Sequence, residues 1–231
     1  MLFNALSSLL TGGNIDIMSI VAQILSILFV VIFILPLHEY AHGIVAYKLG
    51  DPTPKYDRRL TLNPLASIDP VGSMALLIFG YGWAKPVQVN PRNFKNPKRD
   101  MAIVAVAGPL SNVLAALVGQ IILSGMFAFN VITSYNSVAY FIAIILSSYV
   151  SINLSLAAFN LIPMPPLDGS RIIGAFLSDN ALYKYYSYQR YFTIIFIVLM
   201  FSGVLSVPLS FVWNILYNAV SFVAEIPFMF I

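Results

Sequence analysis

The chain contains only two histidines, His38 and His42, and Glu39 directly follows the first of them. In a helix, residues four apart lie on one face, so the two imidazoles can bind one zinc ion. Glu39 lies about 100° around such a helix, close enough to reach a water molecule on the ion. Zinc lowers the pKa of bound water from about 15.7 to about 7, and a neighbouring glutamate can then accept its proton. The pattern predicts a hydrolytic metal centre with Glu39 as general base.

The same H-E-x-x-H pattern also occurs by chance in soluble helices, where a histidine is more often structural than a metal ligand. Here it lies at the end of an apolar run that begins near Ile17. A charged residue inside a membrane helix costs about 2.5–3.5 kcal/mol on insertion scales. A hydrated, protein-lined pocket that holds a cation avoids this penalty. We therefore predict one Zn²⁺ per chain, bound by His38 and His42.

Two histidines leave a catalytic zinc site one protein ligand short. Because the chain has no cysteine and no third histidine, the third ligand should be Asp or Glu. Asp168 follows an apolar span in the stretch FNLIPMPPLDGSRI, where three prolines end the helix and Gly169 permits a sharp turn. We predict that this break turns Asp168 toward the histidines. The alternative is an ordinary loop in which Asp168 caps a helix.

Membrane-spanning helices are the elements that would position these residues. The chain is 59% hydrophobic and 9% charged, whereas a soluble domain carries about 25% charged residues. We predict an all-α polytopic membrane protein of about five to six transmembrane helices, forming a single domain over residues 1–231. A turn at Pro208 should separate the last two spans. The expected spans are residues 17–47, 101–129, 138–161, 191–207 and 209–228.

The segment between the first two spans is polar, with one apolar run, GSMALLIFG (72–80), too short to cross a bilayer. Residues 82–94 show strand-like alternation, so we expect a re-entrant or β-hairpin-like segment over about 60–95. Nine of the twelve Lys and Arg residues lie between Lys48 and Arg99. Such clustering marks the cytoplasmic side of a membrane protein. It does not indicate nucleic-acid binding.

Three motifs, HEYAH (38–42), AGPLSN (107–112) and NLIPMPPLDG (160–169), resemble the site-2 protease family, peptidase family M50. This family consists of intramembrane zinc metalloproteases, and the resemblance is closest to compact prokaryotic members without PDZ or CBS domains. It covers most of residues 30–175. The resemblance implies that His38, His42 and Asp168 bind zinc and that Glu39 activates water.

The resemblance also implies two substrate-binding residues. Asn160 is expected to bind substrate or to donate a hydrogen bond to the developing oxyanion. The alternative for Asn160 is a hydrogen bond within the helix bundle beside the proline break. Asn112 is the second candidate, while Gly108 and Pro109 before it are expected to permit close helix packing or a kink.

The expected function is regulated intramembrane proteolysis, in which transmembrane segments of membrane proteins are cleaved. We expect this in a prokaryotic plasma membrane, with the active site toward the cytoplasm. The expected partners are a transmembrane protein or peptide substrate, the lipid bilayer, and a regulatory membrane partner or a homo-oligomer. Substrate access is expected to be controlled by the membrane domain itself or by a partner.

Two other functions are consistent with H-E-x-x-H in a membrane protein. A prenyl-protein type of zinc protease would complete its site with a glutamate on a later helix, for which Glu225 is available. A zinc transporter or non-hydrolytic zinc-binding protein would need metal-binding groups along a path through the bilayer. The predicted outer half of the bundle offers no acid or histidine for such a path.

Overall fold

A computed structural model describes residues 21, 24–25, 28–72, 74, 84–132 and 137–229. Four described helices are long and apolar enough to cross a membrane, and the described residues include no β-strand. The all-α polytopic architecture predicted from the sequence is therefore confirmed. In chain order the elements are η1 (Val30–Ile34), α3 (Leu35–Lys48), α4 (Thr53–Tyr56), α5 (Pro64–Ser67), η2 (Pro91–Asn93), α7 (Pro97–Ala128), α8 (Ser137–Asn160), α9 (Asp168–Gly174), α10 (Asp179–Ser187), α11 (Gln189–Ser202), α12 (Ser206–Glu225) and η3 (Ile226–Phe228).

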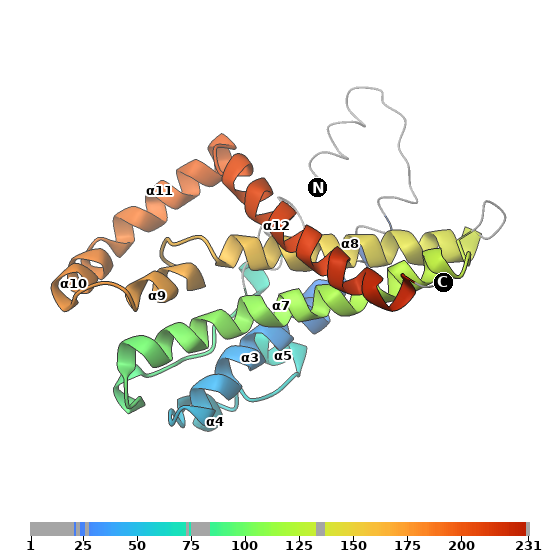
Figure 1. Cartoon of the computed structure of the whole chain (residues 1–231). Coiled ribbons are helices and arrows are strands. Elements are labelled where there is room, and N and C mark those ends of the chain that lie inside the picture. The colour runs from blue at the N-terminus through green and yellow to red at the C-terminus, as the bar shows by residue number, and fades with distance from the viewer. Residues whose placement is uncertain are drawn as a thin grey trace.

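Helix α7 is the centre of the bundle and contacts α3, α8, α9 and α12 (Figure 1). Small residues allow these close contacts, because a Cβ on Gly119 of α7 would lie 2.7 Å from the Tyr149 ring of α8. A buried cluster of Ala116, Val150 and Leu154 continues the α7–α8 contact onto α12. Helix α7 therefore packs against α3, α8 and α9, the helices that carry or precede the candidate site residues.

The first membrane helix changes its pitch just before the histidines. In η1, a π-helical turn, the Leu35 N–H bonds back to the Val30 carbonyl, five residues earlier. Pro36 follows immediately and has no N–H to donate to the preceding turn. The regular α-helix α3 therefore begins at Leu35, directly after the π turn and one residue before this proline. Residues 17–20 of the predicted span lie outside the described residues.

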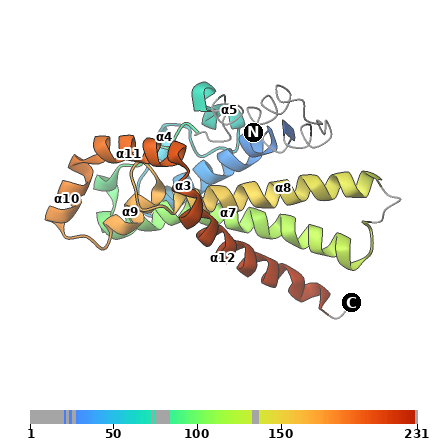
Figure 2. The same cartoon turned by 90° about the horizontal axis from the view of Figure 1, so that it is seen from above.

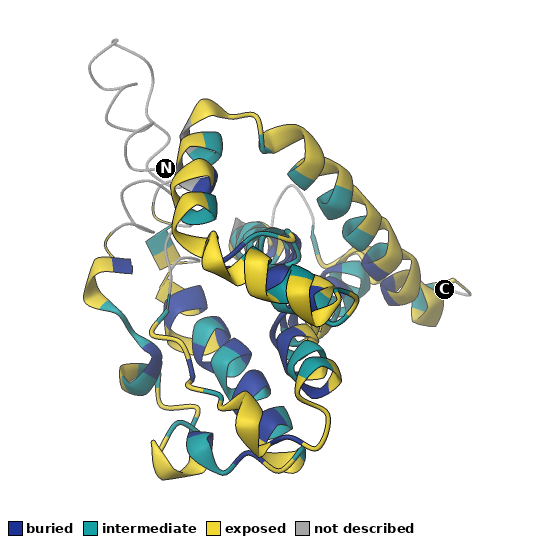
Figure 3. Cartoon of the chain, turned by 90° about the vertical axis from the view of Figure 1, so that its left-hand side faces the viewer, coloured by how far each residue is buried: buried dark blue, intermediate teal, exposed yellow. Residues whose placement is uncertain are grey.

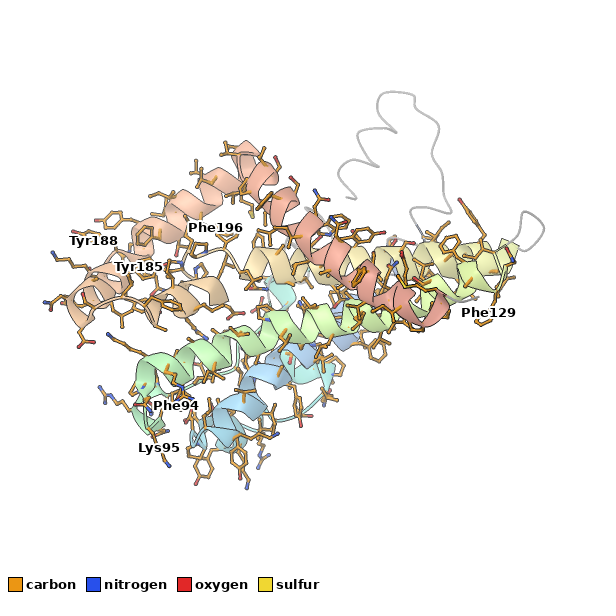
Figure 4. All side chains as sticks on the ribbon, viewed as in Figure 1. Phe94, Lys95, Phe129, Tyr185, Tyr188 and Phe196 are labelled. Carbon is orange, nitrogen blue, oxygen red and sulfur yellow. The ribbon has the colours of Figure 1, made fainter. Side chains whose placement is uncertain are left out.

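The segment predicted to be re-entrant or hairpin-like has no β-strand among its described residues, so the hairpin is not found there. Residues 84–90 are extended but unpaired, and η2 follows them. Their alternation reflects burial, since Val87 packs against Gly43 of α3. Phe94 is buried with Ala46 and Val104 close to the start of α7 (Figure 4). The run 72–80, apart from Gly72 and Met74, lies outside the described residues.

The C-terminal helices differ from the prediction in two ways. Helix α11 has only 14 residues, so four helices in the described part of the chain meet the length and apolarity needed for a span, and these do not support the predicted count of five to six. The chain turns at Gly203, whose φ of 75° suits glycine. The predicted turn at Pro208 is wrong, because Pro208 lies in the first turn of α12. An N–H missing at that position breaks no helical bond.

The two ends of the bundle carry different structures. The start of α7, α9 and α10 lie at one end, and the end of α7 and the start of α8 lie at the other (Figures 1 and 2). Buried residues gather toward the middle of the helices, whereas much of the outer surface is exposed (Figure 3). Helix α10 has no buried residue at all. The charged residues at the start of α7 and in α10 therefore lie at the end at which α8 passes into α9.

Candidate metal centre

Helix α3 presents His38 and His42 side by side toward α7. Their Nε2 atoms lie 3.0 Å apart, and both residues are buried. The spacing of four residues places the rings one helical turn apart, as predicted. On the other side of His42, Nδ1 donates a hydrogen bond to the Val104 carbonyl of α7 at 2.7 Å. This bond fixes the neutral tautomer whose Nε2 lone pair points into the site.

The turn between α8 and α9 brings Asp168 to the histidines. Its Oδ2 lies 3.1 Å from Nε2 of His42 and 3.3 Å from Nε2 of His38. Together with the two imidazole nitrogens, this carboxylate oxygen offers an anionic ligand to a metal ion.

Two glycines make this convergence sterically feasible. A Cβ on Gly108 of α7 would lie 2.6 Å from Nε2 of His38 and closer still to Nε2 of His42. A Cβ on Gly169 would lie 2.6 Å from the carbonyl carbon of Ile162 and would press on the carbonyl oxygens of the turn. The first glycine leaves open the space between the ligand atoms, and the second lets α9 begin directly against the turn.

The three ligand atoms fit a zinc ion. With Zn–N bonds of about 2.0–2.1 Å, neighbouring atoms of a tetrahedral shell lie about 3.3 Å apart, close to the separations seen here. In the described part of the chain, His38, His42 and Asp168 are the group that could share one metal ion. Glu225 is exposed on α12 and does not belong to this group. Two imidazoles and one carboxylate are a donor set typical of catalytic zinc.

Glu39 is half-buried beside the ligands and is held by the segment that precedes α7. Its Oε2 accepts a hydrogen bond from the Val87 N–H at 2.7 Å. That contact orients the carboxylate and leaves Oε1 able to accept a proton. The arrangement suits a general base, which needs a fixed position within reach of the proton it accepts.

The two asparagines occupy different surroundings. Asn112 lies one turn after Gly108 on α7 and is 1% exposed, and neither its Nδ2 nor its Oδ1 has a hydrogen-bond partner among the described residues. The Asn160 Nδ2 donates to the Leu156 carbonyl within its own helix at 3.0 Å. The structure thus places an unpaired amide near the site at Asn112 and a self-satisfied one at Asn160.

Sequence reasoning missed the two backbone contacts that orient the site, the Val104 carbonyl on His42 and the Val87 N–H on Glu39. Every residue offers the same main-chain groups, so the sequence carries no signal for them. Gly108 did carry a signal, since the G-P-x-x-N motif indicated close packing. The structure shows that the close approach is to the histidines.

Comparisons with known proteins identify relatives of the chain. Residues 123–203 match the sequence profile of peptidase family M50. YwhC of Bacillus subtilis, which is assigned as a zinc metalloprotease, is 40% identical over 71% of this chain and 74% of its own length. The zinc metalloprotease MJ0392 of Methanocaldococcus jannaschii is 31% identical over 67% of this chain, but only 35% of that protein is covered. No solved structure matches the chain.

Proposed function

The chain belongs to peptidase family M50 and is a zinc metalloprotease of the membrane, and on this premise we propose that it hydrolyses peptide bonds within transmembrane segments of membrane proteins. One observation supports this more than any other. Three buried ligand atoms from α3 and α9 converge beside Glu39, although Asp168 follows His42 by 126 residues in the sequence. A buried site within membrane-spanning helices suits a substrate that is itself embedded in lipid.

Each residue of the site would have a separate role in hydrolysis. His38, His42 and Asp168 would hold the Zn²⁺, which when bound supplies Lewis acidity and a more acidic water. Glu39 would accept a proton from the attacking water at Oε1 and pass it to the leaving amine. The Val104 carbonyl would keep His42 in the tautomer that binds metal.

We assign the buried amide of Asn112 to substrate binding. Its Nδ2 has no partner among the described residues, and one helical turn separates it from Gly108, whose Cα faces the ligand atoms. An amide donor at that place can stabilise oxyanion charge. Asn160 could contribute in the same way only after its bond to the Leu156 carbonyl is broken, so its substrate role is the more demanding proposal.

The extended residues 84–90 are proposed to hold the unwound substrate chain by strand pairing. They run beside Glu39, and the exposed Gln88 N–H has no hydrogen-bond partner among the described residues. Gln88→Pro removes this N–H, whereas Gln88→Ala removes only the side chain. We expect the proline variant to raise KM for a transmembrane peptide about fivefold and the alanine variant to leave it unchanged. Equal KM values for the two would contradict strand pairing.

We propose that the chain spans a prokaryotic plasma membrane and that its site lies toward the cytoplasmic side. The end of α3, α4 and the start of α7, which carry Lys48, Lys55, Lys98 and Arg99, lie at the same end of the bundle as α9 (Figure 1). Positive charge favours the cytoplasmic side. The ligands lie near this same end, so the proposed orientation gives the site access to cytoplasmic water.

The proposal is tested by the conservative variant Glu39→Gln, purified and reconstituted with a reporter transmembrane peptide. We expect one zinc per chain and a loss of cleavage of at least about 10³-fold, because the amide cannot accept the proton. Glu225→Gln, an exposed acid on α12, is the matched control and should cleave normally. Continued cleavage by Glu39→Gln would refute the assignment of the general base. Zinc flux across the vesicle without cleavage by the wild type would favour a transporter.

A further inference from the structure

Asp51 is a fully buried carboxylate that no part of the proposed reaction uses. It lies just beyond the end of α3 and is 0% exposed. Its Oδ1 accepts hydrogen bonds from the Thr53 N–H at 3.1 Å, the Thr53 hydroxyl at 2.6 Å and the Asn93 amide at 2.7 Å. Its Oδ2 accepts the Asn90 N–H at 2.7 Å. Four donors thus satisfy a buried charge for which the described residues provide no salt bridge.

Two of these donors belong to the extended segment that reaches Glu39. Asn90 and Asn93 follow Val87 by three and six residues, and the Val87 N–H is the group that binds Glu39. Upstream of Val87, the Lys85 N–H donates to the Ser67 carbonyl at 2.8 Å, and the Arg59 guanidinium donates to the Lys85 carbonyl. The segment 84–93 is therefore held on both sides of Val87, with Asp51 as its downstream anchor.

Asp51 and Glu39 are connected in two ways: by the chain of α3 and by hydrogen bonds to segment 84–93. Both lie on the same stretch of chain, since Asp51 follows the last turn of α3 and Glu39 lies in its first half. The segment crosses from one to the other and bonds to each carboxylate through a backbone N–H, from Val87 and from Asn90. A shift of the segment at Asp51 would therefore move the Val87 N–H away from Glu39.

We propose that Asp51 is a positioning residue for the peptidase reaction, anchoring segment 84–93 so that the Val87 N–H stays on Glu39. The inference rests on the proposed function for its catalytic consequence, but the anchoring itself does not. Loss of the anchor frees the carboxylate of Glu39 without touching His38, His42 or Asp168. A misplaced catalytic group lowers kcat, while zinc binding should be preserved.

Asp100 provides a matched comparison. It is also a buried acid, 6% exposed, and its Oδ2 accepts the Asn96 N–H at 3.1 Å in the first turn of α7. It contacts neither Glu39 nor segment 84–93 through any hydrogen bond seen in the described residues. Replacing it removes a comparable buried carboxylate without removing the anchor.

The experiment uses the absence of cysteine in the natural chain. Val87→Cys introduces a single thiol at a position that is 4% exposed, and it retains the backbone N–H that binds Glu39. Asp51→Ala, Asp51→Asn and Asp100→Asn are each combined with Val87→Cys in the full, zinc-loaded chain. Maleimide labelling then reports release of the segment, while zinc content, kcat and KM on a reporter transmembrane peptide are measured with the valine restored.

We expect Asp51→Ala to raise the labelling rate and lower kcat by about tenfold each, with KM within about twofold and one zinc per chain. Asp51→Asn should fall between Asp51→Ala and the wild type, because one acceptor oxygen remains. Asp100→Asn should leave labelling and kcat within about twofold of the wild type.

Each other outcome overturns a defined part of the inference. Unchanged labelling in Asp51→Ala would refute the anchor, and raised labelling with unchanged kcat would refute the link to Glu39. If Asp51→Ala does not fold, Asp51→Asn decides, since raised labelling with full zinc supports the anchor and wild-type labelling refutes it. If the wild type cleaves no peptide, the proposed function fails, but the labelling comparison still decides the anchor.

Discussion

Two irregular segments position Asp168 and Glu39, and the two segments are held in place in different ways. Residues 161–167 carry the chain from α8 to the candidate ligand Asp168 and are held mainly by local turns, such as the one in which the Leu167 N–H donates to the Met164 carbonyl at 3.0 Å. Residues 84–94 reach Glu39 and are held by partners distant in sequence, such as Asp51, 39 residues before Asn90. One segment is stiff because of its own sequence, and the other is positioned by its surroundings.

This difference indicates that Asp168, a candidate metal ligand, and Glu39, the proposed general base, are positioned by separate contacts. Prolines restrict the backbone of residues 161–167 before any tertiary contact forms. The extended segment has no ladder to hold it, so removing one remote side chain should shift it. Variants near 161–169 should therefore change zinc affinity first, and variants that release 84–94 should change kcat while zinc remains bound.

The largest expected effect comes from Gly169→Ala. The added Cβ would press on the backbone carbonyls of Leu161 and Ile162, which cannot move aside as a side chain would. Asp168 should be displaced, so we expect zinc affinity to fall about 100-fold, with cleavage lost in parallel. Zinc titration of the metal-free protein measures this directly.

Gly174→Ala is the control in the same helix. Its Cβ would meet the flexible end of Leu182 at 3.1 Å, so zinc affinity should stay near that of the wild type. Normal zinc affinity in Gly169→Ala would show that the turn is less rigid than its contacts indicate, and would break the contrast between the two segments.

An intermediate effect is expected from Arg59→Ala. The guanidinium of Arg59 donates to the Lys85 carbonyl at the upstream end of segment 84–94. Loss of one such bond to a charged donor should lower kcat about fivefold, with zinc content unchanged. The exposed Lys55→Ala serves as the control for loss of a nearby positive charge. A fall in zinc content in Arg59→Ala would contradict the independence of the two sets of contacts.

The smallest effect is expected from Tyr185→Phe. The Tyr185 hydroxyl of α10 donates to the Pro163 carbonyl at 2.9 Å (Figure 4), and this is a remote contact on the metal-side turn. Because the turn is held mostly by itself, the zinc dissociation constant should rise only about threefold. Tyr183→Phe, at a tyrosine that is 77% exposed, should change nothing. A change in kcat with unchanged zinc affinity would show that Tyr185 acts on the segment that contacts Glu39 and not on the turn that carries Asp168.

The residues of the candidate metal centre could be predicted because the chain offers few choices. With two histidines and no cysteine, the third ligand had to be an acid, and Asp168 stood out by its Pro-rich break. Asp51 could not be distinguished in the same way. It shares a polar stretch with Asp57, Asp69 and Asp100, and only a contact with a distant segment makes it different.

The course of the segments outside the long helices was harder to predict. Alternation around Val87 and Val89 indicated a strand, but burial against α3 produces the same pattern without a ladder. The turn near the C-terminus was expected at Pro208 and lies at Gly203. Proline is compatible with both a turn and the first turn of a helix, so the residue type could not decide between them.

The position of Val104 along α7 sets the depth in the bilayer at which the proposed reaction would take place. Val104 is the eighth residue of this helix, so the contact with His42 lies about 10 Å along the axis from its start. Lys98, Arg99 and Asp100 occupy the first turn and belong among lipid headgroups, whereas the hydrocarbon layer is about 30 Å thick. The reacting bond would thus sit near one margin of the layer. Of the two fragments released, one would keep most of its apolar stretch and stay embedded, and the other would be short enough to leave into water.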